Sequence, residues 1–159
     1  MQTAPQGFFS GTNGMDASNK LPFFPAGFVG KVRVDACKGI TERAGTRAFI
    51  AEVTVLESNL PNVFVNGKYS WFQRIRPGSE DTAYQACIGF LYACLGLDQN
   101  RDKSKIQTEI KPKQDQYLNN AVSDVNPLAG TVIALQTANK KMKDKVSDFT
   151  IHSWSASTA

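Results

Sequence analysis

Residues 68–97, KYSWFQRIRPGSEDTAYQACIGFLYACLGL, contain the change from strand to helix that decides the fold. The first nine residues combine aromatic and basic side chains, and we interpret them as a strand. The sequence Pro-Gly-Ser at 77–79 then interrupts this pattern, and two acidic residues follow where they suit the first turn of a helix. We therefore predict a strand that ends near Arg76 and a helix that runs to about Leu97.

Further strand patterns lie on both sides of this stretch. Residues 28–37 alternate small apolar residues, the last of them Ala36, with charged ones, and residues 49–57 alternate in the same way. After the helix, residues 128–136 are apolar and rich in β-branched side chains, and residues 146–155 alternate again. The sequence thus predicts three strands, a helical region and two more strands.

This order of elements is that of an OB-fold, a five-stranded Greek-key barrel with its helix between strands three and four. We expect a mainly β domain with some helix over residues 21–155, in which residues 98–112 form a charged, irregular connection and residues 113–124 a short second helix. Residues 1–20 are interpreted as a flexible N-terminal arm and residues 156–159 as a short neutral tail.

Composition and cysteine content narrow the class of protein. The chain has 159 residues, 42% of them hydrophobic and 20% charged, which is enough for one folded domain. No apolar run approaches the roughly 18 residues that span a bilayer, and the N-terminus lacks the layout of a secretory signal, so we expect a cytoplasmic protein. Cys37, Cys87 and Cys94 are expected to be buried free thiols.

No residue pattern points to catalysis. His152 is the only histidine, and the chain lacks the glycine-rich cofactor loops, the nucleophile elbow and the Cys-x-x-Cys pairs that support cofactor, nucleophilic or zinc chemistry. We therefore expect a protein that is not an enzyme and that holds no cofactor or metal.

The strand at residues 68–76 combines aromatic and basic residues. Alternation places Phe72 on the same face as Lys68, Arg74 and Arg76, and places Tyr69 and Trp71 on the other. Single-stranded nucleic acids need cations for the phosphates and flat rings for the bases, and such stacking contributes about 1–3 kcal/mol per base. An aromatic core strand with a solvated basic face is the alternative interpretation.

Two further basic segments border the same predicted surface. One comprises strand one and the loop after it, and the other is the lysine-rich loop between strands four and five; in an OB-fold these loops flank the binding face. We expect Lys and Arg side chains to contact phosphates, and Phe72, with Trp154 or His152 as further candidates, to stack on bases. The candidate contacts are Lys31, Arg33, Arg43, Arg47, Lys68, Phe72, Arg74, Arg76, Lys140, Lys141, Lys143, Lys145, His152 and Trp154.

The chain resembles a family of small bacteriophage single-stranded-DNA-binding proteins with OB-folds. The resemblance covers residues 21–155 and rests on Pro25 and Gly27 before the first strand, the second strand, the sequence GKYSW at 67–71, NPLAG at 126–130 and FTIHSW at 149–154. It implies sequence-tolerant coating of single strands during phage DNA replication or recombination, in the host cytoplasm, with replication proteins or further copies of the chain as partners. Many such proteins end in an acidic tail, and residues 155–159 contain no acid.

Other functions are left open by the residues. A virion component or an inhibitor of a host enzyme would use the same basic residues as ordinary surface, with Phe8 and Phe9 of the arm suited to docking. Duplex binding is disfavoured because residues 80–97, the predicted main helix, contain no Lys or Arg. RNA remains a candidate ligand because stacking tolerates both sugars.

Overall fold

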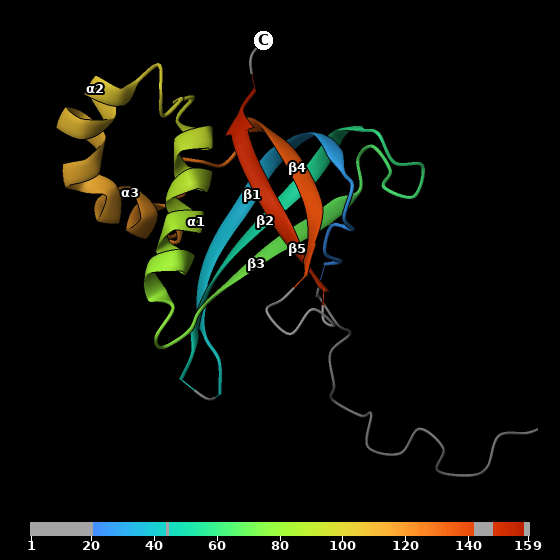
Figure 1. Cartoon of the computed structure of the whole chain (residues 1–159), viewed down its shortest axis with the longest axis horizontal. Helices are drawn as coiled ribbons and strands as arrows, with labels where there is room; N and C mark the ends of the chain where they lie inside the picture. The colour runs from blue at the N-terminus through green and yellow to red at the C-terminus, as the bar shows by residue number, and fades with distance from the viewer. Residues whose placement is uncertain (1–20, 44, 142–147, 158–159) are drawn as a thin grey trace, which may run out of the picture.

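The computed structural model describes residues 21–43, 45–141 and 148–157, which form one five-stranded sheet flanked by helices (Figure 1). All four strand pairs are antiparallel, and the order across the sheet is β3-β2-β1-β4-β5. The strands are β1 (Val29–Thr41), β2 (Arg47–Ser58), β3 (Lys68–Ile75), β4 (Val132–Lys141) and β5 (Asp148–Ala156), and the two longest helices are α1 (Glu80–Cys94) and α3 (Gln114–Ala121). The predicted order of three strands, helices and two strands is confirmed.

The sheet curls so that its two edge strands, β3 and β5, meet through side chains. No ladder of backbone hydrogen bonds joins them within the described residues. The ring of Trp71 on β3 instead lies 5.3 Å from that of Trp154 and 6.1 Å from that of His152, both on β5. Barrel closure by backbone pairing is therefore not part of the described structure.

The segment before β1 helps to cover this gap. The Ser70 N–H on the free edge of β3 donates to the Pro22 carbonyl at 2.9 Å, and the Gly27 N–H donates to the Thr137 carbonyl of β4, also at 2.9 Å. Between these two anchors, Phe24 is 3% exposed and its ring stacks 4.6 Å from that of Tyr69. The proline-stiffened lead-in thus ties the β3 edge to β4.

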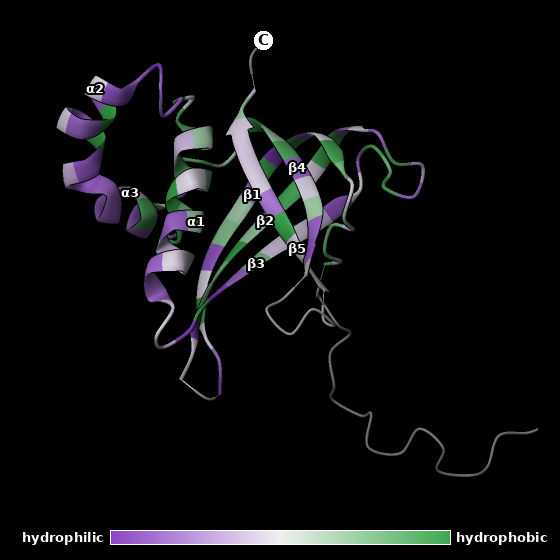
Figure 2. Cartoon of the chain, viewed as in Figure 1, coloured by the Kyte–Doolittle hydropathy of each residue, from purple (hydrophilic) through white to green (hydrophobic). Residues whose placement is uncertain are grey.

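The main core lies between the curled sheet and α1. Phe28, Val32, Val34, Phe90 and Leu135 are fully buried there. Figure 2 shows hydrophobic residues along the strands and on α1, and mainly hydrophilic ones on the region that contains α2. Helix α1 buries one broad face against the sheet, as its sequence predicts.

The prediction that residues 98–112 are irregular is wrong. They contain a short helix α2 (Lys103–Lys105), a π-helical turn (Ile106–Ile110) and the start of a 3-10 turn (Lys111–Lys113). Ile106 and Ile110 are both buried and pack in a second small cluster with Tyr92 and Leu97. This pair of isoleucines, four residues apart, lies on one helical face and anchors an otherwise charged sequence.

The inward face of β1 also differs from the prediction. The register with β2 shifts between Val34 and Ala36, so Asp35 is an extra residue opposite β2, as in a β-bulge. Because a one-residue shift reverses the faces, Ala36 is only half-buried and Cys37 takes the inward position. The strand then continues to Thr41, beyond the predicted end.

Other predictions are confirmed or adjusted in their bounds. All three cysteines are buried and free. The short second helix is present as α3, and α1 ends at Cys94, followed by Gly96 with a φ of 73°. Strand β4 begins at Val132, because residues 127–130 form a turn, and the side chain of the preceding Asn126 accepts a hydrogen bond from the Leu128 N–H. No helix in the described part of the chain is long and apolar enough to cross a membrane.

Candidate nucleic-acid interface

The two faces of β3 carry different side chains, as the sequence predicts. Trp71 is 5% exposed, and Tyr69 packs against the core. Phe72, half-buried, and Arg74, exposed, alternate with them on the outward face. Neighbouring Ser70 is buried, because its hydroxyl donates to the Leu21 carbonyl of the lead-in.

An aromatic and cationic surface forms around Phe72. The Arg74 guanidinium carbon lies 4.6 Å from the Phe72 ring centroid, within the range of a cation–π contact. On the lead-in, Phe23 is 63% exposed, and its ring centroid is 6.5 Å from that of Phe72. Phe23 was missed by sequence reasoning, although adjacent Phe23 and Phe24 in an extended segment must point to opposite sides, so one of the pair faces outward.

Carboxylates accompany many of the predicted cations. The described ion pairs of the sheet are Lys31–Glu57 at 4.0 Å, Arg33–Asp35 at 3.0 Å, Lys38–Glu52 at 2.6 Å and Arg74–Glu42 at 2.9 Å. Lys31 and Arg33 are therefore on the strand predicted for them, but their charge is compensated locally. Glu42, Glu52 and Glu57 were not recognised as partners because only the strand register and the hairpin geometry bring them close.

An arginine-rich end of the sheet, made by Arg43, Arg47, Arg74 and Arg76, lies where the β1–β2 hairpin, the end of β3 and the start of α1 meet (Figure 1). Arg47 pairs in register with Ile75, between Arg74 and Arg76 in sequence. Arg43 and Arg76 are exposed and make no ion pair with any described residue. These two side chains have guanidinium groups available for an anion.

Two other predicted cations differ in their surroundings. Arg47 donates to the Tyr84 hydroxyl of α1 at 2.7 Å, so its guanidinium is held beside an aromatic ring. Lys68, exposed at the start of β3, makes no ion pair within the described residues. It lies at the opposite end of β3 from Arg74 and Arg76.

The lysine-rich loop is described only in part. Lys140 is exposed on β4, and the backbone of Lys141 pairs with that of Asp148. Lys143 and Lys145 lie outside the described residues. The convergence of this loop with the outward face of β3 therefore stays a prediction.

His152 and Trp154 lie on the inner side of the sheet, away from Phe72. Both contact Trp71, and the His152 ring also lies 6.2 Å from Phe24. Burial lowers the pKa of His152 to about 4, partly offset by a hydrogen bond with the backbone of Thr150. The alternation of β5 turns both side chains inward, where they pack between β3 and β5, and their role in base stacking stays a prediction.

The buried nitrogens of this aromatic cluster lack partners. His152 Nε2 and Trp154 Nε1 make no hydrogen bond with any described residue. A neutral imidazole is the form that such an environment favours, because a buried charge without a partner is costly.

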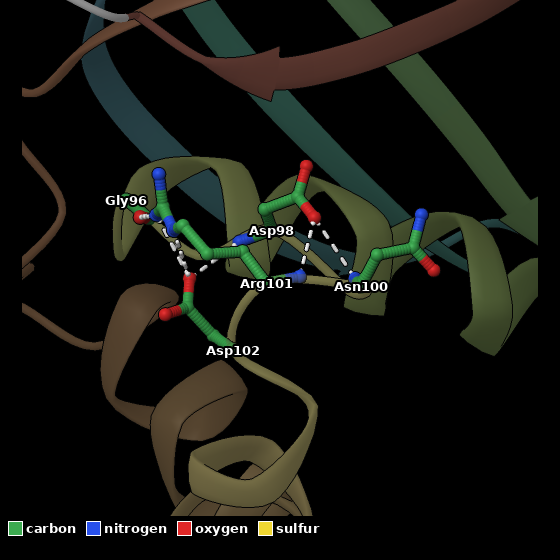
Figure 3. A network of polar contacts seen from close by, with 5 residues as sticks. All are labelled: Gly96, Asp98, Asn100, Arg101 and Asp102. Carbon is green, nitrogen blue, oxygen red and sulfur yellow. Dashed lines mark hydrogen bonds and ion pairs between the residues drawn. The ribbon is translucent and has the colours of Figure 1, made fainter.

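A polar network between α1 and α2 uses charged groups of the connection (Figure 3). The Asp98 carboxylate accepts from the backbone N–H groups of Asn100 and Arg101 at 2.8 and 2.9 Å. The Arg101 guanidinium donates to Asp102 at 2.8 Å and to the Gly96 carbonyl at 2.9 Å. These contacts lower the pKa of both carboxyl groups, and they hold the turn after α1 rather than present a free cation.

A largely apolar groove of about 580 Å³ lies among the β1–β2 hairpin, α1 and α3. Ile40, Tyr84 and Val122 line it and are each more than a third exposed.

No group of three or more His, Cys, Asp or Glu side chains suited to a metal ion occurs in the described part of the chain. No protein-family model matches this chain, and no curated protein matches it in sequence.

Proposed function

We propose that this protein is a non-enzymatic binder of single-stranded DNA and that the strand crosses the outward face of β3. The observation that carries this proposal is that Phe72 lies close to both the Arg74 guanidinium and the exposed ring of Phe23. Flat rings beside a cation supply both the stacking and the phosphate contacts that a single strand of nucleic acid needs.

The strand order supports an OB-fold as the scaffold of this site. In β3-β2-β1-β4-β5, strand β1 pairs with both β2 and β4, and the helices are inserted between β3 and β4. These are features of a Greek-key OB barrel. The approach of the β3 and β5 edges around Trp71 is consistent with a barrel that is sealed there by side chains.

The distribution of charge favours a single strand over a duplex. Helix α1 bears no basic residue in its last turn and none elsewhere, so it is unsuited to entering a major groove. The exposed cations Arg43 and Arg76 lie instead on the turn and strand end near Arg74. Combined with the resemblance to phage single-strand binders, this supports coating of exposed DNA during phage replication or recombination.

The proposal is tested by replacing the central ring. Phe72→Ala should weaken binding of labelled oligo-dT by about 1–3 kcal/mol, the contribution of one stacked base, in a fluorescence anisotropy titration at low salt. Phe64→Ala is the matched control, because Phe64 is also an exposed phenylalanine, at 70%, but lies in the β2–β3 loop. Equal affinity of both variants and the parent protein would reject this site.

A protein-interaction module is the second candidate, and the apolar groove favours it. In this case apolar side chains of a partner protein would occupy the space beside Ile40 and Val122. Val122→Asp would then abolish co-purification of a stoichiometric protein partner while leaving oligo-dT binding unchanged. If the Val122→Asp variant still co-purifies with the partner protein and still binds oligo-dT, this alternative is wrong.

A further inference from the structure

Arg74 is held between an aromatic ring and a carboxylate. Its Nε lies 2.9 Å from Glu42 Oε1, and its guanidinium carbon lies 4.6 Å from the centroid of Phe72. The ion pair remains accessible to solvent, since the two side chains are 47% and 32% exposed. One acidic group thus contacts the cation that lies closest to the proposed stacking surface.

The backbone of the hairpin fixes the position of Glu42. Its N–H donates to the Thr46 carbonyl at 2.8 Å, and its own carbonyl accepts from the Gly45 N–H at 2.8 Å. The carboxylate is therefore presented to Arg74 from a closed turn rather than from a loose loop. Arg43 follows it directly, so the carboxylate stands within the arginine-rich end of the sheet.

The other acidic residues near the arginine-rich end of the sheet, Glu80 and Asp81, make no described ion pair with Arg74. Glu80, at the start of α1, accepts a hydrogen bond from the Gly78 N–H at 2.7 Å. Asp81 is exposed in the same first turn, where the helix dipole favours it. Glu42 is the carboxylate that forms the described ion pair with Arg74.

We propose that Arg74 forms a phosphate subsite, which the Glu42 carboxylate occupies in the free protein and which a phosphate of the nucleic acid takes over on binding. The inference rests on the proposed function. Guanidinium groups bind carboxylates and phosphates through the same charge-assisted N–H···O hydrogen bonds, so the two anions compete for one set of donors. After the exchange, Glu42 remains beside a polyanion and opposes its binding.

The exchange also affects stacking. In the free protein the Arg74 guanidinium covers one side of the Phe72 ring. Movement of the guanidinium towards a phosphate uncovers that side for a base. Glu42 therefore restrains both the phosphate contact and access to the ring.

Glu42→Gln tests the inference, because it removes the charge and keeps the shape. We expect the variant to bind labelled oligo-dT about two- to fivefold more tightly, the range of an exposed ion pair. The slope of log K against log salt concentration should stay the same, because Arg74 contacts one phosphate in both complexes. Glu109→Gln is the matched control and should leave the affinity unchanged: it removes the same charge from an exposed residue on the π-helical turn, outside the sheet.

A double-mutant cycle separates direct competition from a general change in charge. In an Arg74→Gln background, the gain in affinity from Glu42→Gln should be smaller, because the competition for Arg74 is absent and only the repulsion between Glu42 and the polyanion is relieved. An undiminished gain in that background, or unchanged or weaker binding by Glu42→Gln alone, would overturn the subsite while leaving the proposed function in place. If the parent protein itself fails to bind oligo-dT at low salt, the proposed function falls and the subsite with it.

Discussion

Acidification should destabilise the protein through His152, whose ring is packed between β3 and β5. Its contacts are aromatic: Trp71 and Trp154 lie at centroid distances of 6.1 Å, and Phe24 at 6.2 Å. Burial lowers the pKa of His152 from its ordinary 6.5 to about 4 in the folded protein. The unfolded chain therefore binds a proton at this residue more readily than the folded chain does.

The magnitude follows from this difference in pKa. A pKa that is lower by about 2.5 in the folded protein corresponds to about 3 kcal/mol of unfolding free energy, because each pKa unit is equivalent to 1.36 kcal/mol. The full stability is present above about pH 6.5, and it is lost progressively as the pH falls towards 4. Between pH 8 and pH 4.5 the contribution of His152 should decrease by about 2–3 kcal/mol.

Urea unfolding followed by tryptophan fluorescence measures this loss. His152→Phe is the comparison, since it keeps an aromatic ring among Trp71, Trp154 and Phe24 but cannot titrate. The difference in unfolding free energy between the parent protein and the variant should change by about 2–3 kcal/mol in favour of the variant at the lower pH, while carboxyl titrations common to both cancel. A difference that is constant from pH 8 to 4.5 would refute the burial of a neutral imidazole.

Three further predictions concern packing and reactivity. Gly30→Ala should prevent native pairing of β1 with β2 or lower the unfolding free energy by several kcal/mol, because an added Cβ would lie 2.0 Å from the Glu57 carbonyl oxygen. A thermal unfolding midpoint close to that of the parent protein would contradict this prediction. Phe90→Ala should lower the free energy of urea unfolding by about 3–5 kcal/mol, because the Phe90 ring is fully buried with its centroid 5.6 Å from that of Trp71. A loss below 1 kcal/mol would mean that the core is less tightly packed than described. Burial raises the pKa of the thiols, to about 11 for Cys37 and about 12 for Cys87, and raises that of Cys94 as well. All three should react with a thiol reagent at pH 8 only after denaturation, and rapid labelling of the native protein would show otherwise.

The regular strands and α1 could be predicted because their hydrophobic patterns are local. Alternation from Phe49 to Val55 and the Pro-Gly-Ser break before Glu80 each express one element within a few residues. The bulge at Asp35 could not be seen in this way, since nothing in the alternation of β1 marks an extra residue. It depends on how β1 and β2 pair, and it moves Cys37 rather than Ala36 into the core.

The candidate site was predicted in its central residues and missed in its surroundings. Phe72 and Arg74 follow from strand alternation, whereas the Glu42 partner requires the hairpin to fold back beside β3. The inward turn of His152 likewise depends on which face of β5 meets Trp71. Such contacts join residues more than thirty positions apart, so a pattern read along the chain does not contain them.

The most direct test of single-strand binding is an anisotropy titration of labelled oligo-dT and of a duplex of equal length, each at two salt concentrations. We expect the protein to bind oligo-dT more tightly than the duplex, with an affinity that falls with salt at a slope of about −0.7 per phosphate neutralised. Absence of binding to oligo-dT at low salt, or equal affinity for both ligands, would contradict the account.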